Sequence, residues 1–171
     1  MKAYVIDENV PIVANDIVRP VKIATQADDA CRLACVQALR KAVKSGIVIV
    51  DTLGEVLEKY RAKLQYKGQP GVGDAFYKHV VDHQFNRKRV RRTAVPRHSK
   101  REFEHFPEVD ALATFDRSDR IFVALAIASP EAPEILNSVD SDYTEHRIPL
   151  ASAGVKVREI CPQCIRISRS E

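Results

Sequence analysis

The sequence predicts a single α/β domain over residues 1–171, with a three-layer α/β/α architecture and a mostly parallel central sheet. Strand-like apolar runs alternate along the chain with segments of helical periodicity, and this order is typical of parallel strands joined by right-handed crossovers. The run at residues 47–50 is β-branched throughout, as expected of a strand buried on both faces. With 45% apolar and 29% charged residues, the chain has the composition of one ordinary globular domain.

The first part of the chain predicts two strands and two helices. Gly46 follows the first helical pattern at the position of a C-terminal cap, and Asp51 and Thr52 are placed to cap the second. In chain order we expect a strand at 3–6, a loop at 9–15 punctuated by Asn and Pro, a helix at 27–45, a strand at 47–50 and a helix at 53–64.

The second part predicts further helices and two closing strands. Residues 65–106 read as a basic helical insertion within the domain, an elaboration on the core that contains one helix. In chain order we expect helices at 74–86, after Pro107 and at 119–128, then strands at 135–139 and 155–160. The longest late apolar stretch, 121–129, is too short to span a bilayer. The chain opens directly on a strand pattern rather than a signal peptide, which predicts a cytoplasmic protein with no membrane partner.

The four cysteines are expected to be thiols, because disulfides are rare in the cytosol. They fall in two pairs, Cys31/Cys35 and Cys161/Cys164. A zinc site would need all four, and so would require the helix at 27–45 to pack beside the last strand. A redox role lacks the strand–CxxC–helix context. Ordinary thiols are the preferred interpretation.

Several acids follow predicted strands or open predicted helices. Asp7 and Asp140 end strands, with Asp142 two residues later, and Asp119 and Glu55 lie in first helical turns. Because ligands of open parallel sheets bind outside the carboxyl ends of the strands, we expect these acids to converge on one rim with little basic counter-charge.

Each acid also has a purely structural interpretation. Asp119 can serve as a helix N-terminal acid, with Asp116 as its rival, and Asp140 and Asp142 can form a turn. The Thr52-x-x-Glu55 spacing is that of a capping box, and Glu55 is also placed for an i,i+4 pair with Lys59. Glu55 is therefore the most contested of the group.

A converging set of carboxylates is unfavourable unless cations neutralise it. Hard oxygen ligands, without His or Cys at hand, favour Mg²⁺ or Mn²⁺ over zinc. Such ions can activate a water and stabilise the leaving oxygen in phosphodiester cleavage. No Ser/His/Asp triad, phosphate-cradling loop or dinucleotide motif competes with this interpretation.

The charge distribution favours a polyanionic partner. The chain carries a net charge of +4, and residues 86–101 hold eight Lys/Arg and no acid. We expect this segment to contact the phosphates of a nucleic acid, which supplies affinity rather than sequence specificity. The predicted nucleic-acid-binding residues are Arg87, Lys88, Arg89, Arg91, Arg92, Arg97, Lys100 and Arg101.

Four motifs in order resemble those of PIN domains. The strand that ends at Asp7, followed by Asn9, resembles the family's opening motif, and the segment after strand 47–50 that holds Glu55 resembles its second acidic position. Asp119 before a small-residue apolar helix resembles the third. The strand that ends at Asp140, with the later strand led by Gly154, resembles the closing pattern. The basic segment at 65–106 departs from a minimal PIN domain.

The resemblance implies a metal-dependent endoribonuclease, either a toxin of a toxin–antitoxin pair or an RNA-processing factor. It implies catalytic roles for Asp7, Glu55, Asp119 and Asp140, with Asp142 as a further metal ligand, and cleavage that leaves a 3′-hydroxyl and a 5′-phosphate. RNA, an antitoxin or other inhibitory protein, and a second copy of the chain are the partners considered. A non-catalytic RNA-binding module with the same fold is the alternative, and a phosphatase or DNA flap-type nuclease is a third interpretation.

Overall fold

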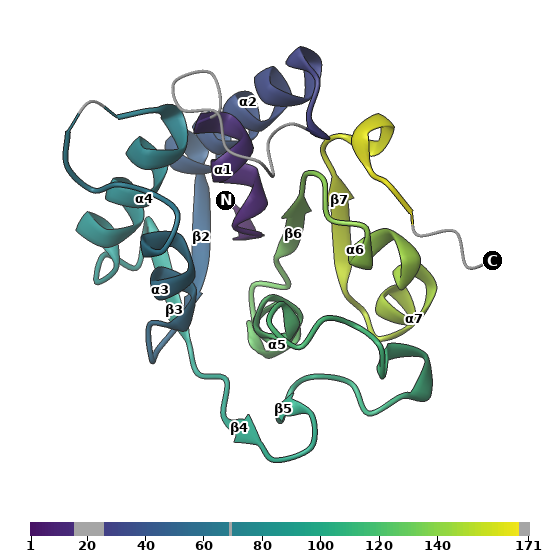
Figure 1. Ribbon diagram of the computed structural model, residues 1–171. Coiled ribbons are helices and arrows are strands. Elements are labelled where there is room, and N and C mark those ends of the chain that lie inside the picture. The colour runs from purple at the N-terminus through teal and green to yellow at the C-terminus, as the bar shows by residue number, and fades with distance from the viewer. Residues whose placement is uncertain (16–25, 69, 168–171) are drawn as a thin grey trace.

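The computed structural model describes residues 1–15, 26–68 and 70–167 and contains a five-stranded parallel sheet flanked by helices (Figure 1). The strands lie in the order β3-β2-β1-β6-β7, and every neighbouring pair is parallel. Their bounds are β1 Lys2–Ile6, β2 Gly46–Asp51, β3 Val90–Thr93, β6 Glu134–Asn137 and β7 Lys156–Glu159. The predicted α/β class and parallel sheet are therefore confirmed, and the arrangement is compatible with three layers.

Helices connect consecutive strands of the sheet, and a small antiparallel pair of strands lies apart from it. The helices are α1 Asn9–Asn15, α2 Asp29–Ser45, α3 Glu55–Arg61, α4 Val72–His83, α5 Arg120–Ala128, α6 Asp142–Glu145 and α7 Arg147–Ser152, with 3-10 turns η2 Asp110–Leu112 and η3 Pro162–Cys164. The small pair is β4 Arg97–His98 and β5 Glu102–Phe103, seen below α5 in Figure 1. None of the described helices is both long and apolar enough to cross a membrane.

Strand order reverses at β1, which has β2 on one side and β6 on the other. Ile6 at the end of β1 is in register with Leu136 of β6, so the carboxyl ends of these two strands are neighbours. All four residues of β1 from Ala3 to Ile6 are buried, and α5, which packs on β1 and β6, buries Ile121 to Ala126. A ligand site of an open parallel sheet is expected at this switch point.

The loop predicted at 9–15 is instead the helix α1. Asp7 Oδ1 accepts a hydrogen bond from the main-chain N–H of Asn9 at 2.9 Å and so satisfies one of the free donors of the first turn. Pro11 also lies in that first turn, where a missing N–H breaks no helical bond. Helix α1 packs so closely on α4 that a Cβ on Gly73 would lie 1.9 Å from the Pro11 carbonyl oxygen.

The predicted insertion, 65–106, supplies two elements of the central fold. These are α4, which packs on α1 and α2, and the edge strand β3, which pairs with β2. The arginines concealed this strand from the sequence pattern. Val90 and Thr93 are buried, while Arg91 between them is half-buried and Arg92 is exposed.

Helix α3 begins at Glu55 and lacks the predicted Thr52–Glu55 capping box. Asp51 caps it instead, since its carboxylate accepts from the main-chain N–H groups of Glu55 and Val56, both at 2.9 Å. The buried Asp51 at the end of β2 is therefore committed to the helix start.

The prediction that all four cysteines are thiols was wrong in this structure. Cys31 of α2 and Cys161 form a disulfide, with Cα atoms 5.2 Å apart, while Cys35 and Cys164 are buried thiols. The C-terminal segment folds back beside α2, the packing that the sequence did not reveal, and Gln163 contacts Asp28 at the start of that helix.

Candidate metal centre

Three carboxylates meet at the carboxyl ends of β1 and β6. Asp7 directly follows β1, Asp140 lies in the turn after β6, and Asp119 is the N-cap residue of α5. One carboxylate oxygen from each residue lies within 4.8 Å of the other two. The group can hold a metal ion, and its position is the strand-order switch point.

Asp7 is held rigidly at the centre of the group. Its side chain is fully buried, and its two oxygens accept from the main-chain N–H of Asn9 and from the Tyr143 hydroxyl at 3.2 Å. Burial raises the pKa of Asp7 well above its usual range, and the charges of Asp119, Glu8 and Asp140 raise it further. A divalent cation would offset all of these costs.

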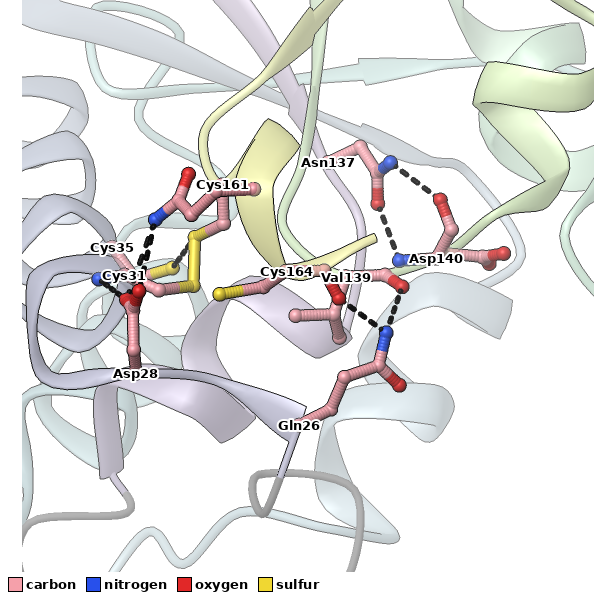
Figure 2. Close-up of a disulfide and its surroundings, with 10 residues drawn as sticks. Gln26, Asp28, Cys31, Cys35, Asn137, Val139, Asp140, Cys161 and Cys164 are labelled. Carbon is pink, nitrogen blue, oxygen red and sulfur yellow. Dashed lines mark hydrogen bonds between the residues drawn. A yellow bond between two sulfur atoms is a disulfide. The ribbon is translucent and has the colours of Figure 1, made fainter. Parts of the chain in front are cut away.

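Asp140 sits in a turn that Asn137 organises, as Figure 2 shows. The Asn137 side chain donates to the Asp140 carbonyl at 2.8 Å and accepts from its N–H at 3.2 Å. The turn interpretation and the metal interpretation are therefore compatible. Burial raises the pKa of Asp140 to about 7, with the charges of Asp119 and Asp142 acting in the same direction.

Asp119 makes no capping hydrogen bond, although it occupies the N-cap position of α5. Its Oδ1 instead accepts from Lys59 Nζ at 3.2 Å and faces the Ser118 hydroxyl at 3.4 Å. The rival residue, Asp116, is exposed, and its carboxylate accepts from the Ser118 N–H. Asp119 thus points into the acidic group and Asp116 does not belong to it.

Two residues of the site were missed by the sequence analysis. Lys59 of α3 inserts its ammonium between acids, with Nζ 2.9 Å from Glu8 Oε1, so the expectation of little counter-charge was wrong. Burial opposes protonation of Lys59, but the hydrogen bonds and charges of Glu8 and Asp119 raise its pKa overall. Glu8 is next to Asp7 in the sequence, and this adjacency could have identified Glu8 as a residue of the site.

Glu55 and Asp142 lie outside the group of three. Glu55 Oε2 pairs with Arg97 at 2.5 Å rather than with Lys59. Asp142 opens α6 and accepts from the main-chain N–H of Asp116 at 2.6 Å, and its own N–H donates to Asp140 Oδ1 at 2.9 Å. Burial raises the pKa of Asp142. Asp142 thus borders the site through Asp140, whereas Glu55 faces the β4–β5 side.

The donor set fits a hard divalent cation. All the converging atoms are carboxylate oxygens, which Mg²⁺, Mn²⁺ and Ca²⁺ prefer. Glu8 Oε2 is buried and has no hydrogen-bond partner in the part of the chain that the structure describes. Such an orphaned acceptor is costly in a dry interior unless a cation or water reaches it.

The eight predicted nucleic-acid-binding residues divide into three kinds. Arg91, Arg97 and Arg101 pair with Glu131, Glu55 and Glu108. Arg89 and Arg92 donate to main-chain carbonyls. Arg87, Lys88 and Lys100 are exposed and form no ion pair with residues 1–15, 26–68 or 70–167. Glu131 and Glu55 are distant from the segment in the sequence, where a local charge count cannot see them, and Glu108 lies shortly after it.

A pocket of about 450 Å³ adjoins the acidic group on the side of α3 and the β4–β5 pair. Lys59 lines both the pocket and the acidic group, and Ser118 lines it next to Asp119. Arg97 and Arg117 add positive charge to its wall, although both pair with Glu102. A polyanion in this pocket would lie beside the carboxylates and against guanidinium groups.

The fold and the site together define a class: an α/β protein with a parallel sheet and an acidic, metal-competent group at its switch point. Comparisons with protein-family models, with curated proteins and with solved structures found no match for this chain.

Proposed function

We propose that the protein is a divalent-metal-dependent endoribonuclease of PIN-like architecture. The observation that carries the proposal is the convergence of Asp7, Asp119 and Asp140 within 4.8 Å at the carboxyl edge of a parallel sheet. All three residues belong to the sequence motifs that resemble PIN domains, and they occur along the chain in the order of the PIN motifs.

Asp7, Asp119 and Asp140 would hold Mg²⁺ or Mn²⁺. When bound, such an ion activates water for attack on a phosphodiester and stabilises the leaving oxygen. Tyr143 and the Asn9 N–H orient the Asp7 carboxylate for this role. Asn137 fixes the turn that carries Asp140. These contacts preorganise the ligands and reduce the reorganisation that cation binding requires.

The chain's own cations would serve the substrate. Lys59 neutralises Glu8 and Asp119 and lines the pocket beside them. A backbone phosphate in that pocket would attract the Lys59 ammonium away from the acids. The exposed Lys100, between β4 and β5, would add a contact to a flanking phosphate. Arg87 and Lys88, which precede β3 at the other edge of the sheet, would contact phosphates farther along a single strand.

The test is cleavage of a structured RNA and a DNA of matching sequence by the purified full chain, with Mg²⁺, Mn²⁺ or EDTA. We expect metal-dependent RNA cleavage that Asp7→Asn and Asp119→Asn each reduce by more than about 100-fold. Asp29→Asn changes an exposed acid on α2 and should leave the rate unchanged. Cleavage that survives both site variants contradicts the proposal, and preferential DNA cleavage contradicts the RNA assignment.

One observation favours the alternative, a non-catalytic RNA-binding module. The acidic group already has an internal cation in Lys59, so part of its charge is neutral without metal. The alternative predicts RNA affinity that is unchanged by EDTA, Asp7→Asn and Asp119→Asn, with no cleavage under any condition.

A further inference from the structure

All four cysteines of the chain gather between α2 and the C-terminal segment (Figure 2). Cys31 and Cys35 lie one helical turn apart on the same face of α2. Cys161 directly precedes the 3-10 turn η3, and Cys164 is the last residue of that turn. The Sγ atoms of Cys31, Cys35 and Cys161 lie within 4.8 Å of one another. The cluster differs chemically from the carboxylate group, because its ligand atoms are soft sulfurs rather than hard oxygens.

Cys164 is the fourth cysteine of the cluster. It is buried, its thiol faces the Asp28 carboxylate, and its charge would act on Cys35. Figure 2 shows its side chain directed toward the Cys31–Cys161 bond. Four buried cysteines from two short segments thus lie together, with Cys164 next to the group of three whose sulfurs lie within 4.8 Å of one another.

We propose that, once its disulfide is reduced, this cluster binds one Zn²⁺ through Cys31, Cys35, Cys161 and Cys164. Both spacings, Cys-x₃-Cys and Cys-x₂-Cys, fall in the range typical of structural zinc sites. Zn–S bonds of about 2.3 Å in a tetrahedron place sulfurs about 3.8 Å apart. The Cys35 and Cys161 sulfurs are already 3.9 Å apart.

A buried hydroxyl group lies beside Cys35. The Ser138 hydroxyl lies beside Cys35, is fully buried and has no oxygen or nitrogen partner among the described residues. It is free to donate to a thiolate, as outer-shell groups of metal sites do.

The zinc site forms in two steps, reduction of the disulfide and then binding of the ion. A dithiol transfers two electrons and two protons to the Cys31–Cys161 bond, which opens to two thiols while the dithiol closes to a disulfide. One Zn²⁺ then accepts an electron pair from each of four sulfurs, and four thiol protons pass to solvent.

The zinc site would support the segment that carries Asp140. Gln26 Nε2 donates to the Val139 carbonyl at 3.2 Å and to the Cys164 carbonyl at 2.7 Å, and so ties η3 to the turn after β6 (Figure 2). Ser138, next in that segment, contacts Cys35. The proposed ion would therefore brace α2, the C-terminal segment and the Asp140 turn against one another.

The experiment is metal analysis of the full chain after reduction with dithiothreitol, removal of the reductant without air, and addition of Zn²⁺ or Co²⁺. We expect one Zn²⁺ per chain and four thiols that resist alkylation until EDTA is added. Co²⁺ should give thiolate-to-metal charge-transfer bands and the visible absorption of a tetrahedral thiolate site. Iron retained in place of zinc, or two reactive thiols with the disulfide intact, would overturn the proposal.

Single variants assign the ligands. Each Cys→Ser change should lower zinc affinity by more than the roughly 100-fold limit typical of outer-shell changes. Ser138→Ala should lower it by about 10-fold and keep the stoichiometry. Asp7→Asn alters the carboxylate group alone and should leave the Co²⁺ thiolate spectrum intact, which separates this site from the proposed nuclease centre. Unchanged zinc affinity in Cys35→Ser or Cys164→Ser would also refute the four-cysteine assignment.

Discussion

Lys59 Nζ lies 3.2 Å from Oδ1 of Asp119, although 60 residues separate them in the sequence. The same ammonium is 2.9 Å from Glu8. One half-buried lysine therefore neutralises part of an acidic group that would otherwise be strongly self-repelling. Any divalent cation that enters the group must share Asp119 with this lysine, so metal binding and the position of Lys59 are coupled.

Lys59→Met should destabilise the metal-free protein by about 1–3 kcal/mol, because it leaves Glu8 and Asp119 without their donor. Saturating Mn²⁺ should restore more stability to this variant than to the unmodified chain, since the ion replaces the lost positive charge. Urea unfolding with EDTA or Mn²⁺ measures both effects. Lys78→Met removes an exposed i,i+4 pair with Asp82 and should cost much less stability, with no change in the Mn²⁺ response. Equal losses in the two variants would contradict the coupling.

Asp7→Asn should raise the stability of the metal-free protein and abolish the stabilisation by Mn²⁺. The change removes a buried charge surrounded by other acids, while an amide oxygen can still accept from the Asn9 N–H. In the unmodified chain, Mn²⁺ at 100 times its Kd should add about 2.7 kcal/mol to the free energy of unfolding. Thermal or urea unfolding with and without Mn²⁺ reports both changes. A metal response that persists in Asp7→Asn would place the ion elsewhere.

The metal-free protein should lose stability as pH rises from about 4 to about 7. The Asp140 carboxyl keeps its proton up to about pH 7 in the native state but loses it near its ordinary value of 3.8 when unfolded. Between these values the native state binds more protons, so the contribution of Asp140 to the free energy of unfolding falls with pH. Asp140→Asn should flatten this part of the profile, measured by urea unfolding in EDTA. Asp29→Asn is the matched control, and an identical slope in both variants would refute the assignment.

Neutralising Arg87, Lys88 and Lys100 to Gln should weaken RNA binding and lower its salt dependence. Each phosphate contact with a single strand contributes about 0.7 to the slope of log K against log salt, so three lost contacts should reduce the slope by about 2. Arg147, Lys156 and Arg166 are exposed cations in the C-terminal part of the chain, and their change to Gln is the matched control. Fluorescence anisotropy over a salt series measures both triple variants. Equal losses would indicate only a general effect of net charge.

Glu55→Gln should affect metal binding much less than Asp7→Asn does. Glu55 pairs with Arg97 at a partly exposed position, and such pairs contribute less than about 1 kcal/mol. Isothermal titration with Mn²⁺ compares the two variants, with exposed Glu58→Gln as a control on the same helix. A loss of Mn²⁺ affinity as large as that of Asp7→Asn would return Glu55 to the ligand set.

The local sequence pattern was sufficient to predict the strands nearest the site. A β-branched run and strands that end in acids predict β1, β2 and β6, because burial on both faces leaves a continuous apolar signature. Asp7 and Asp140 follow from that pattern, since parallel strands place their carboxyl ends at a common edge, and Asp119 follows from its place at the start of an apolar helix. The edge strand β3 was missed because only its first and last residues are buried, and the two residues between them are arginines.

The charge partners of the acidic group and of several arginines were decided by tertiary structure. Lys59 pairs with Glu8 and Asp119 rather than with Glu55, and arginines of the basic segment find acids elsewhere in the chain. The cysteine cluster has the same origin, because Cys31 and Cys161 are 130 residues apart in the sequence. Periodicity and strand ends indicate the secondary structure and burial of a residue relative to its neighbours in the chain. Which distant segments share a surface depends on how the helices and the C-terminal segment pack, and no local pattern encodes that packing.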